Sequence, residues 1–166
     1  GATFTANNSI NGGNVTGVTI NQPTPKNLYW VGGNGNWSDI NHWALSSGGT
    51  GGSCVPNQLD NVFFDGNSFS SVNDTVTITM PVAYCKTMDW TGALLSPRFI
   101  STNCVLNIYG SLKLEAGMLF KTSEISFEST SPGEVITSKG YYYNGTNFRF
   151  NGIGGGWTFT DSLKGG

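Results

Sequence analysis

Apolar and polar residues alternate over short stretches of the chain. Between residues 75 and 79, Val76 and Ile78 stand between threonines, which is the period-two pattern of a half-buried strand. Pairs of apolar residues with one residue between them then recur at Leu106/Ile108, Leu112/Leu114, Met118/Phe120, Ile125/Phe127, Phe148/Phe150 and Trp157/Phe159. Turn-forming Gly, Ser, Asn and Thr residues separate most of these pairs. The pattern predicts a series of strands, each of about three or four residues.

The apolar pairs return at a nearly constant spacing. The steps from Leu106 to Ile125 and from Phe127 to Phe148 are both close to a period of about 20 residues. Short strands with such a period are typical of solenoids, in which one coil cannot bury its apolar side alone but a stack of coils can. The sequence therefore predicts an all-β fold, a right-handed parallel β-solenoid (β-helix). A β-sandwich is the alternative, although its strands are usually about five or six residues long.

Two segments precede this regular part. Residues 1–26 contain short β segments and end in a polar connector with two prolines. A Trp- and Gly-rich block follows from Leu28 to about Asp65. The sequence leaves open whether this block caps the solenoid, is inserted as a loop or forms part of the coils. The chain begins in mid-pattern and ends in two glycines, which indicates a piece of a longer protein.

Composition and charge narrow the function classes. Charged residues make up 11% of the chain, against about 25% in a typical soluble domain. The eight basic residues are scattered and the formal net charge is −2, so nucleic-acid binding is not expected. No apolar run approaches the roughly 18 residues of a membrane span, so membrane insertion is not expected either. With 24 glycines and few strong helix formers, a helical bundle is excluded.

The chain has three cysteines, Cys54, Cys85 and Cys104. The Gly-rich, Lys-poor composition is typical of extracellular β proteins, in which disulfides persist. Because three is an odd number, at most one internal bridge forms. We expect it between Cys54 and Cys85, where loop closure would contribute about 3–4 kcal/mol. Cys104 would then be a buried thiol. The alternative is that all three cysteines are reduced and lie in the core.

Candidate catalytic groups are sparse. His42 is the only histidine, and no G-x-S-x-G elbow presents a serine nucleophile. The glutamates of the second half sit at turns or exposed strand positions, without the facing acidic pair that a glycosidase requires. We therefore expect no enzymatic activity and no organic cofactor. A fragment of a polysaccharide-cleaving enzyme is the alternative, because solenoids also host such enzymes.

Carboxylates in the loops of the Trp/Gly-rich block are candidate calcium ligands. Asp39, Asp60 and Asp65 lie near amide side chains, and carboxylate and amide oxygens together suit Ca²⁺. No EF-hand spacing or nonapeptide repeat accompanies them. The alternative is that each carboxylate binds the backbone amides of its own turn.

Aromatic side chains point to sugar binding, because their rings can stack on pyranose rings. The candidate ligand residues are Trp37 and the run Tyr141, Tyr142 and Tyr143. In a strand Tyr142 faces opposite to its two neighbours, which makes it the best exposed platform. The alternative for the tryptophans of the block is a small structural core made of Trp30, Trp37 and Trp43.

The Trp/Gly-rich block also carries the most specific motif of the chain. Residues 28–39 read L-Y-W-V-G-G-N-G-N-W-S-D, and N-H-W, C-V-P and D-N-V-F-F-D follow at 41–43, 54–56 and 60–65. Together with M-D-W-T-G at 88–92 and L-N-I-Y-G-S-L at 106–112, these residues resemble a tandem β-helix repeat module of giant Bacteroidota surface adhesins. This family includes the SprB-like gliding-motility adhesins, which are type IX secretion substrates. The resemblance covers residues 27–163.

The resemblance implies a non-catalytic repeat on the extracellular bacterial cell surface. Residues 1–26 would be the end of a preceding repeat, and residues 27–166 one β-helical module. The implied function is surface attachment during gliding motility, with a surface polysaccharide or other substratum and neighbouring repeats of the same chain as partners. A carbohydrate-binding module with a defined aromatic sugar site is the alternative function.

The same resemblance implies sites of glycosylation. Members of this phylum attach O-linked glycans at Asp-Ser/Thr-aliphatic sequences. Asp74-Thr75-Val76 and Asp161-Ser162-Leu163 fit this pattern. Thr75 and Ser162 are therefore candidate O-glycosylation sites.

Overall fold

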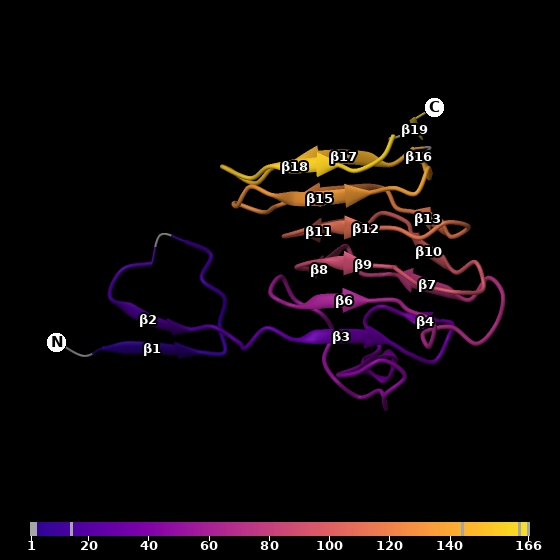
Figure 1. Ribbon diagram of the computed structural model, residues 1–166. Helices are drawn as coiled ribbons and strands as arrows, with labels where there is room; N and C mark the ends of the chain where they lie inside the picture. Colours follow the sequence, from indigo (N-terminus) through magenta and orange to yellow (C-terminus); the bar gives the residue numbers. More distant parts are fainter. Residues whose placement is uncertain (1–2, 14, 144, 163, 166) are drawn as a thin grey trace.

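Short strands stack in parallel along most of the chain (Figure 1). The computed structural model describes residues 3–13, 15–143, 145–162 and 164–165. Within these residues the only helical element is a 3₁₀ turn at Ile40–His42. The strands form a parallel β-solenoid of about four turns. The predicted fold class is confirmed, and the β-sandwich is excluded.

Each complete turn contributes strands to three sides of the solenoid. The seven-stranded sheet, called the long sheet below, contains β3 (Asn27–Trp30), β5 (Trp43–Ala44), β6 (Asn61–Phe63), β9 (Met88–Asp89), β12 (Leu112–Lys113), β15 (Glu134–Thr137) and β18 (Trp157–Phe159). The second sheet contains β4 (Gly35–Asn36), β7 (Thr75–Ile78), β10 (Arg98–Ser101) and β13 (Leu119–Lys121). The third sheet contains β8 (Val82–Cys85), β11 (Val105–Ile108), β14 (Glu124–Phe127) and β17 (Asn147–Phe150). A short pair joins β16 (Tyr142–Tyr143) to β19 (Lys164–Gly165).

Inward-facing apolar residues of successive turns stack on one another. In the long sheet, the parallel register aligns five fully buried residues: Leu28, Val62, Met88, Leu112 and Ile136. In the second sheet it aligns Val76, Phe99 and Phe120, with the two phenylalanine rings stacked at 4.8 Å. Burying one such side chain contributes about 1.5–3 kcal/mol. The ladders between turns therefore stabilise the fold, because a single turn has nothing to cover its apolar side.

The length of the turns varies more than the sequence predicted. Leu106 pairs with Ile125, as the spacing of the apolar pairs predicted. Phe127, however, pairs with Phe150 and not with Phe148, because this turn of the solenoid is longer. The predicted pairing of Phe127 with Phe148 was therefore wrong by two residues, which is one period of side-chain alternation. The face on which these phenylalanines lie was nevertheless predicted correctly, because side chains two residues apart in a strand point to the same side.

The Trp/Gly-rich block supplies both the first turn and a cap below it. β3 and β4 pair with β6 and β7 of the next turn, while β5 returns antiparallel to β3. The segment between β4 and β6 closes this end of the stack (Figure 1). Trp30, Trp37 and Trp43 are fully buried there, and the ring of Trp43 lies edge-on to the other two at 5.1 and 4.9 Å. The small tryptophan core expected from the sequence is therefore present.

The glycines of the motif fit the packing around His42. Gly32 and Gly33 have φ angles of +86° and +73°, a conformation that favours glycine. A Cβ atom on Gly35 would overlap the imidazole ring of His42. That ring stacks on Trp30 at 4.6 Å, and its Nδ1 atom lies 2.7 Å from the carbonyl oxygen of Val31. The glycines of the motif are thus explained by the turn that they form and by the space that His42 occupies in the cap.

The N-terminal strands lie beside the stack and not in it (Figure 1). β1 (Phe4–Asn7) and β2 (Val18–Asn21) form a separate parallel pair, called the ribbon below, in which Phe4 is opposite Val18. A connector leads to β3, and its last residue, Lys26, donates its amide N–H to Asp60 Oδ1 at 2.9 Å. The origin of the ribbon in a preceding repeat stays a prediction.

The last turn is the least covered part of the stack. β17 and β18 are the outermost strands of their sheets in the described part of the chain. The inward-facing Phe150 and Phe159 are 48% and 38% exposed. Phe127, one turn below, is fully buried. Within the described residues the solenoid therefore has one closed end and one open end.

Candidate ligand-binding face

The structure separates the aromatic residues that the sequence proposed for sugar binding. Trp37 is fully buried, with its indole ring against Trp43, so it cannot stack on a sugar ring. Tyr141 is half-buried and packs edge-on against a core phenylalanine at 6.3 Å. The backbones of Tyr142 and Tyr143 form β16, while their side chains lie outside the described residues. Trp37 is therefore a cap residue and not part of a ligand site.

Each of the three candidate calcium ligands binds backbone amides. Asp39 and Asp65 each accept a hydrogen bond of 2.9 Å from the amide N–H two residues further on. Asp60 is fully buried and accepts hydrogen bonds from the amides of Lys26 and Asn57, at 2.9 and 3.0 Å. Across the described residues, no three His, Cys, Asp or Glu side chains form a group that could hold a metal ion. Backbone capping accounts for all three carboxylates.

The predicted Cys54–Cys85 disulfide is absent, and this prediction was wrong. Cys85 belongs to an inward ladder next to Ile108, is fully buried, and burial raises the pKa of its thiol. Cys54 lies at the edge of the core, where its Sγ atom accepts a hydrogen bond from Lys26 Nζ at 3.1 Å, which raises the pKa of the lysine. Cys104 is buried, as predicted. All three residues are free thiols, because the register directs Cys85 into the ladder.

The two candidate glycosylation sites have different surroundings. Thr75 is half-buried at the start of β7, and its hydroxyl donates to the carbonyl oxygen of Asn73 at 3.0 Å. Its amide donates to Asn34 Oδ1 at 2.6 Å. Ser162 is exposed near the open end of the stack. Ser162 is therefore the more accessible of the two hydroxyls.

The outer face of the long sheet carries two columns of mainly polar residues. Side chains alternate along each strand, so the neighbours of every inward residue point outward. The register aligns Asn27, Asn61, Thr87, Ser111, Val135 and Thr158 in the first column. It aligns Tyr29, Phe63, Asp89, Lys113, Thr137 and Thr160 in the second. Together these residues define the outer face, the name used below.

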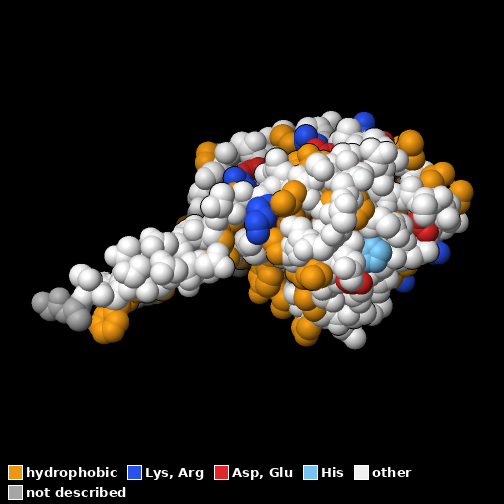
Figure 2. Space-filling model, turned by 90° about the horizontal axis from the view of Figure 1, so that it is seen from below, with side chains coloured by type: hydrophobic (Ala, Val, Ile, Leu, Met, Phe, Trp, Pro, Cys, Tyr) orange, Lys and Arg blue, Asp and Glu red, His pale blue; other side chains and the backbone are white. Residues whose placement is uncertain are grey.

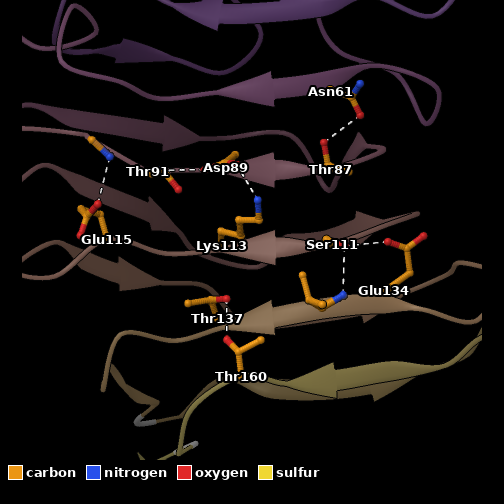
Figure 3. A network of polar contacts seen from close by, with 12 residues as sticks. Asn61, Thr87, Asp89, Thr91, Ser111, Lys113, Glu115, Glu134, Thr137 and Thr160 are labelled. Carbon is orange, nitrogen blue, oxygen red and sulfur yellow. Dashed lines mark hydrogen bonds and ion pairs between the residues drawn. The ribbon is translucent and has the colours of Figure 1, made fainter.

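Side chains of neighbouring turns bind one another along the outer face (Figure 3). The contacts within the columns join Thr87 Oγ1 to Asn61 Oδ1 at 2.7 Å, Lys113 Nζ to Asp89 Oδ2 at 3.3 Å, and the hydroxyls of Thr137 and Thr160 at 2.7 Å. Ser111 donates to Glu134 Oε2 at 2.7 Å and accepts the amide N–H of Val135 at 3.0 Å. These bonds fix the side chains before any ligand arrives.

A shallow depression follows the same columns. Its volume is about 370 Å³, and residues from Asn61 to Val135 of the outer face line it. At the end nearer the cap, the rings of Tyr29 and Phe63 stack on each other at 4.9 Å with an angle of 19° between their planes. An aromatic pair therefore lies next to a row of amide, hydroxyl and charged groups.

This combination suits a neutral ligand that is rich in hydroxyl groups. Aromatic rings provide apolar surface for one face of a sugar, and amide and hydroxyl groups both donate and accept hydrogen bonds. Asp89 and Lys113 form an ion pair, so they add directional groups without net charge. The outer face therefore offers stacking surface and hydrogen-bonding groups in one continuous row.

A second depression lies between the loop of the ribbon and the stack. It has a volume of about 490 Å³ and is lined by Asn11 of the ribbon loop and by Lys86, Tyr109 and Glu128 of the turns. Burial raises the pKa of Tyr109, and the negative charge of Glu128 adds to this effect. Glu128 Oε1 already accepts a hydrogen bond of 2.6 Å from Ser126. Its carboxylate is thus part of the hydrogen bonding that holds this corner of the solenoid.

Comparison with known proteins assigns no family to the chain. No family description, no curated protein and no solved structure matches it. In the part of the chain that the structure describes, no helix is long and apolar enough to cross a membrane. Only the fold class of the chain, a parallel β-solenoid, is therefore established. The resemblance to surface adhesins stays a prediction.

Sequence reasoning missed the residues of the outer face. Tyr29, Phe63, Asp89 and Lys113 each follow directly after an inward residue of the long sheet. That position is the signal that could have revealed them. The turns that separate these residues differ in length, since the step from Tyr29 to Phe63 is longer than the step from Asp89 to Lys113. A constant period could therefore not align them.

Proposed function

We propose that this chain is a non-catalytic β-solenoid module of an extracellular bacterial surface adhesin of the gliding-motility type. In this proposal the outer face of the long sheet contacts a neutral surface polysaccharide. Stacked turns give a stiff support, and repeated copies of such a module multiply weak contacts by raising the effective concentration at the surface. Neighbouring repeats and the substratum are the proposed partners.

The motif that suggested the adhesin family supports a structural role for its residues. Trp30, Trp37 and Trp43 build the cap, and the glycines between them accommodate His42. A motif that specifies a cap is expected wherever such a module must begin a new stack. This agrees with a repeat that functions through its shape and length.

The observation that carries the binding proposal is the ordered outer face. Its aromatic pair, Tyr29 and Phe63, continues into hydroxyl, amide and ion-paired groups that are already held in place. Side chains that are fixed beforehand lose little conformational entropy when a ligand binds. The carboxylates near the depression, Asp89 and Glu134, are bound to Lys113 and Ser111, which favours a binding role for this face over an acid–base role.

Retention on immobilised polysaccharides tests this proposal. The wild-type chain is passed over a panel of neutral and acidic polysaccharides, and Tyr29→Ala and Lys113→Ala variants are compared with it. Tyr84→Ala is the matched control, because Tyr84 is an exposed tyrosine on the third sheet, away from the outer face. Circular dichroism verifies that each variant keeps its strands.

The proposal predicts that a neutral polysaccharide retains the wild type and the Tyr84→Ala variant equally. Tyr29→Ala should bind at least about tenfold more weakly, because it removes stacking surface worth about 1.4 kcal/mol or more. No retention of the wild type by any polysaccharide would contradict binding at this face. Turnover of a polysaccharide that is lost in Glu128→Gln would contradict the non-catalytic assignment.

A further inference from the structure

The ribbon has one apolar face that is only partly covered by the described residues. Alternation along the strands puts Phe4, Ala6, Val18 and Ile20 on the same side of the parallel pair. Phe4 and Val18 are 67% and 39% exposed. A two-stranded sheet cannot bury such a face by itself, and the ribbon projects away from the body of the molecule (Figure 2).

The other face of the ribbon resembles the outside of the solenoid. Asn21 Nδ2 donates to Asn7 Oδ1 at 2.7 Å across the two strands. Asn61 and Asn27 make the same contact at 2.9 Å on the outer face of the long sheet, where the adjacent inward residues are buried. The ribbon thus has the polar outside and apolar inside of two adjacent turns, but it lacks the core that such turns enclose.

The open end of the stack has the complementary features. β18 ends the long sheet and β17 ends the third sheet, so their outer edges keep backbone N–H and C=O groups that no described strand pairs with. Phe150 and Phe159 are exposed there, and their rings contact each other at 6.2 Å. Phe150 also stacks on Phe127 of the turn below at 5.0 Å. At this end no described turn covers the aromatic ladder that runs from Phe127 to Phe150.

We infer that the ribbon of one copy of this chain docks on the open end of a second copy. The ribbon extends the long sheet beyond β18 and places Phe4 and Val18 over Phe150 and Phe159. The occupant is a second copy because one chain carries both surfaces, and they are apart: the ribbon lies beside the stack near β3, while β17 and β18 lie at its top (Figure 1). Two different surfaces meet in this contact, so it is heterologous and can propagate into a row of copies.

This inference goes beyond the proposed function, because it does not depend on polysaccharide binding. It concerns how copies of the module are joined, and strand pairing together with apolar contact supplies the specificity.

Sedimentation velocity of the chain over a range of concentrations tests the inference. One variant carries Phe4→Asp and Val18→Asp in the ribbon, and another carries Phe159→Asp at the open end. Val72→Asp is the control, because Val72 is 65% exposed in the loop between β6 and β7, away from both surfaces. The ribbon variant leaves every buried residue of the solenoid unchanged, so its result does not depend on how well the end variant folds.

The wild type and the Val72→Asp control should associate increasingly as the concentration rises. Each of the other two variants should associate more than about tenfold more weakly, because a carboxylate must lose its water in the apolar contact. An equimolar mixture of these two variants should form dimers and nothing larger, since one intact ribbon and one intact open end remain. A wild type that stays monomeric would overturn the inference. Undiminished association of the ribbon variant, or failure of the mixture to dimerise when both variants are folded, would also overturn it.

Discussion

The two ends of the solenoid differ in how far their inward-facing aromatic residues are buried. At the N-terminal end, the segment between β4 and β6 folds back and buries Trp30, Trp37 and Trp43 completely. At the C-terminal end, the inward-facing Phe150 and Phe159 stay exposed to 48% and 38%. Both ends are rich in aromatic residues, but within the described residues only the first carries a cap.

The difference shows that burial in a stack depends on the neighbouring turn. Phe127 and Phe150 occupy equivalent positions of the same ladder, and only Phe127 has a turn on both sides. A hydrophobic residue that ends a ladder therefore presents surface that a further layer could cover. The cap is that layer at one end, and at the other end we infer a second copy.

The largest expected change in the free energy of unfolding comes from truncating a buried ring of the cap, compared with an exposed ring of the open end. Trp43→Ala should lower the free energy of unfolding by about 3–5 kcal/mol, because it leaves a cavity among buried rings and removes a hydrogen bond from Trp43 Nε1 to the Trp37 carbonyl oxygen. Phe150→Ala should lower it by only about 1–2 kcal/mol, because half of that side chain is already in water. Urea denaturation at low protein concentration measures both values. Equal losses would show that the ends are equally packed.

A buried carboxylate at the border of the cap should give the next largest effect. Asp60→Ala leaves the amides of Lys26 and Asn57 without their acceptor, and we expect a loss of about 2 kcal/mol. Asp39→Ala is the matched control in the 3₁₀ turn, where water can replace the carboxylate and the loss should stay below about 1 kcal/mol. Thermal unfolding monitored by tryptophan fluorescence measures the difference. A larger loss in Asp39→Ala would contradict this account of the cap.

A smaller effect concerns the contact between turns in the middle of the stack. Hydrogen bonds from the Gly92 and Ala116 amides lower the pKa of Glu115. A lowered carboxyl pKa contributes stability above the ordinary pKa of the group, and this is lost as the pH falls through the lowered value. Glu115→Gln should therefore cost less than about 1 kcal/mol at neutral pH and nothing in strong acid. Urea denaturation of both proteins between neutral pH and strong acid should show the two curves converging. A constant difference would contradict a role for the ionised carboxylate.

The smallest expected effect is that of a reducing agent. Because all three cysteines are free thiols, dithiothreitol should leave the free energy of unfolding unchanged. A Cys54–Cys85 bridge would instead contribute about 3–4 kcal/mol. A thiol reagent should modify Cys54 in the folded protein and Cys85 only after unfolding, since Cys85 is fully buried. A loss of stability on reduction would show that a disulfide is present and would contradict the three free thiols of the structure.

Much of the fold could be predicted from the sequence because the alternation of apolar residues is local. The pair Leu106 and Ile108 shows its inward face directly, and its partner turn lies at the spacing that the sequence suggested. The register of Phe127 could not be predicted, because it depends on the length of a loop with little pattern of its own. The closure of the cap could not be predicted for a related reason, since β5 returns antiparallel to β3 against the direction of every other pairing in the long sheet.

Less of the candidate site could be predicted, because it exists only when turns are aligned. Trp37 was a candidate from its residue type alone, and the structure buries it. Tyr29 and Asp89 belong to one outward column, but they lie two turns apart and share no local motif. The cysteine pairing failed in the same way, since the direction in which Cys85 points depends on its place in the ladder.

Residue-resolved amide hydrogen exchange, at a concentration where the chain is monomeric, tests the difference between the two ends most directly. We expect the slowest exchange in the turns next to the cap, at amides such as those of Val62 and Met88, and a steady increase in rate toward the strand β18. Protection at β18 as strong as that at β6, or a gradient that runs in the opposite direction, would contradict a solenoid that is closed at one end and open at the other.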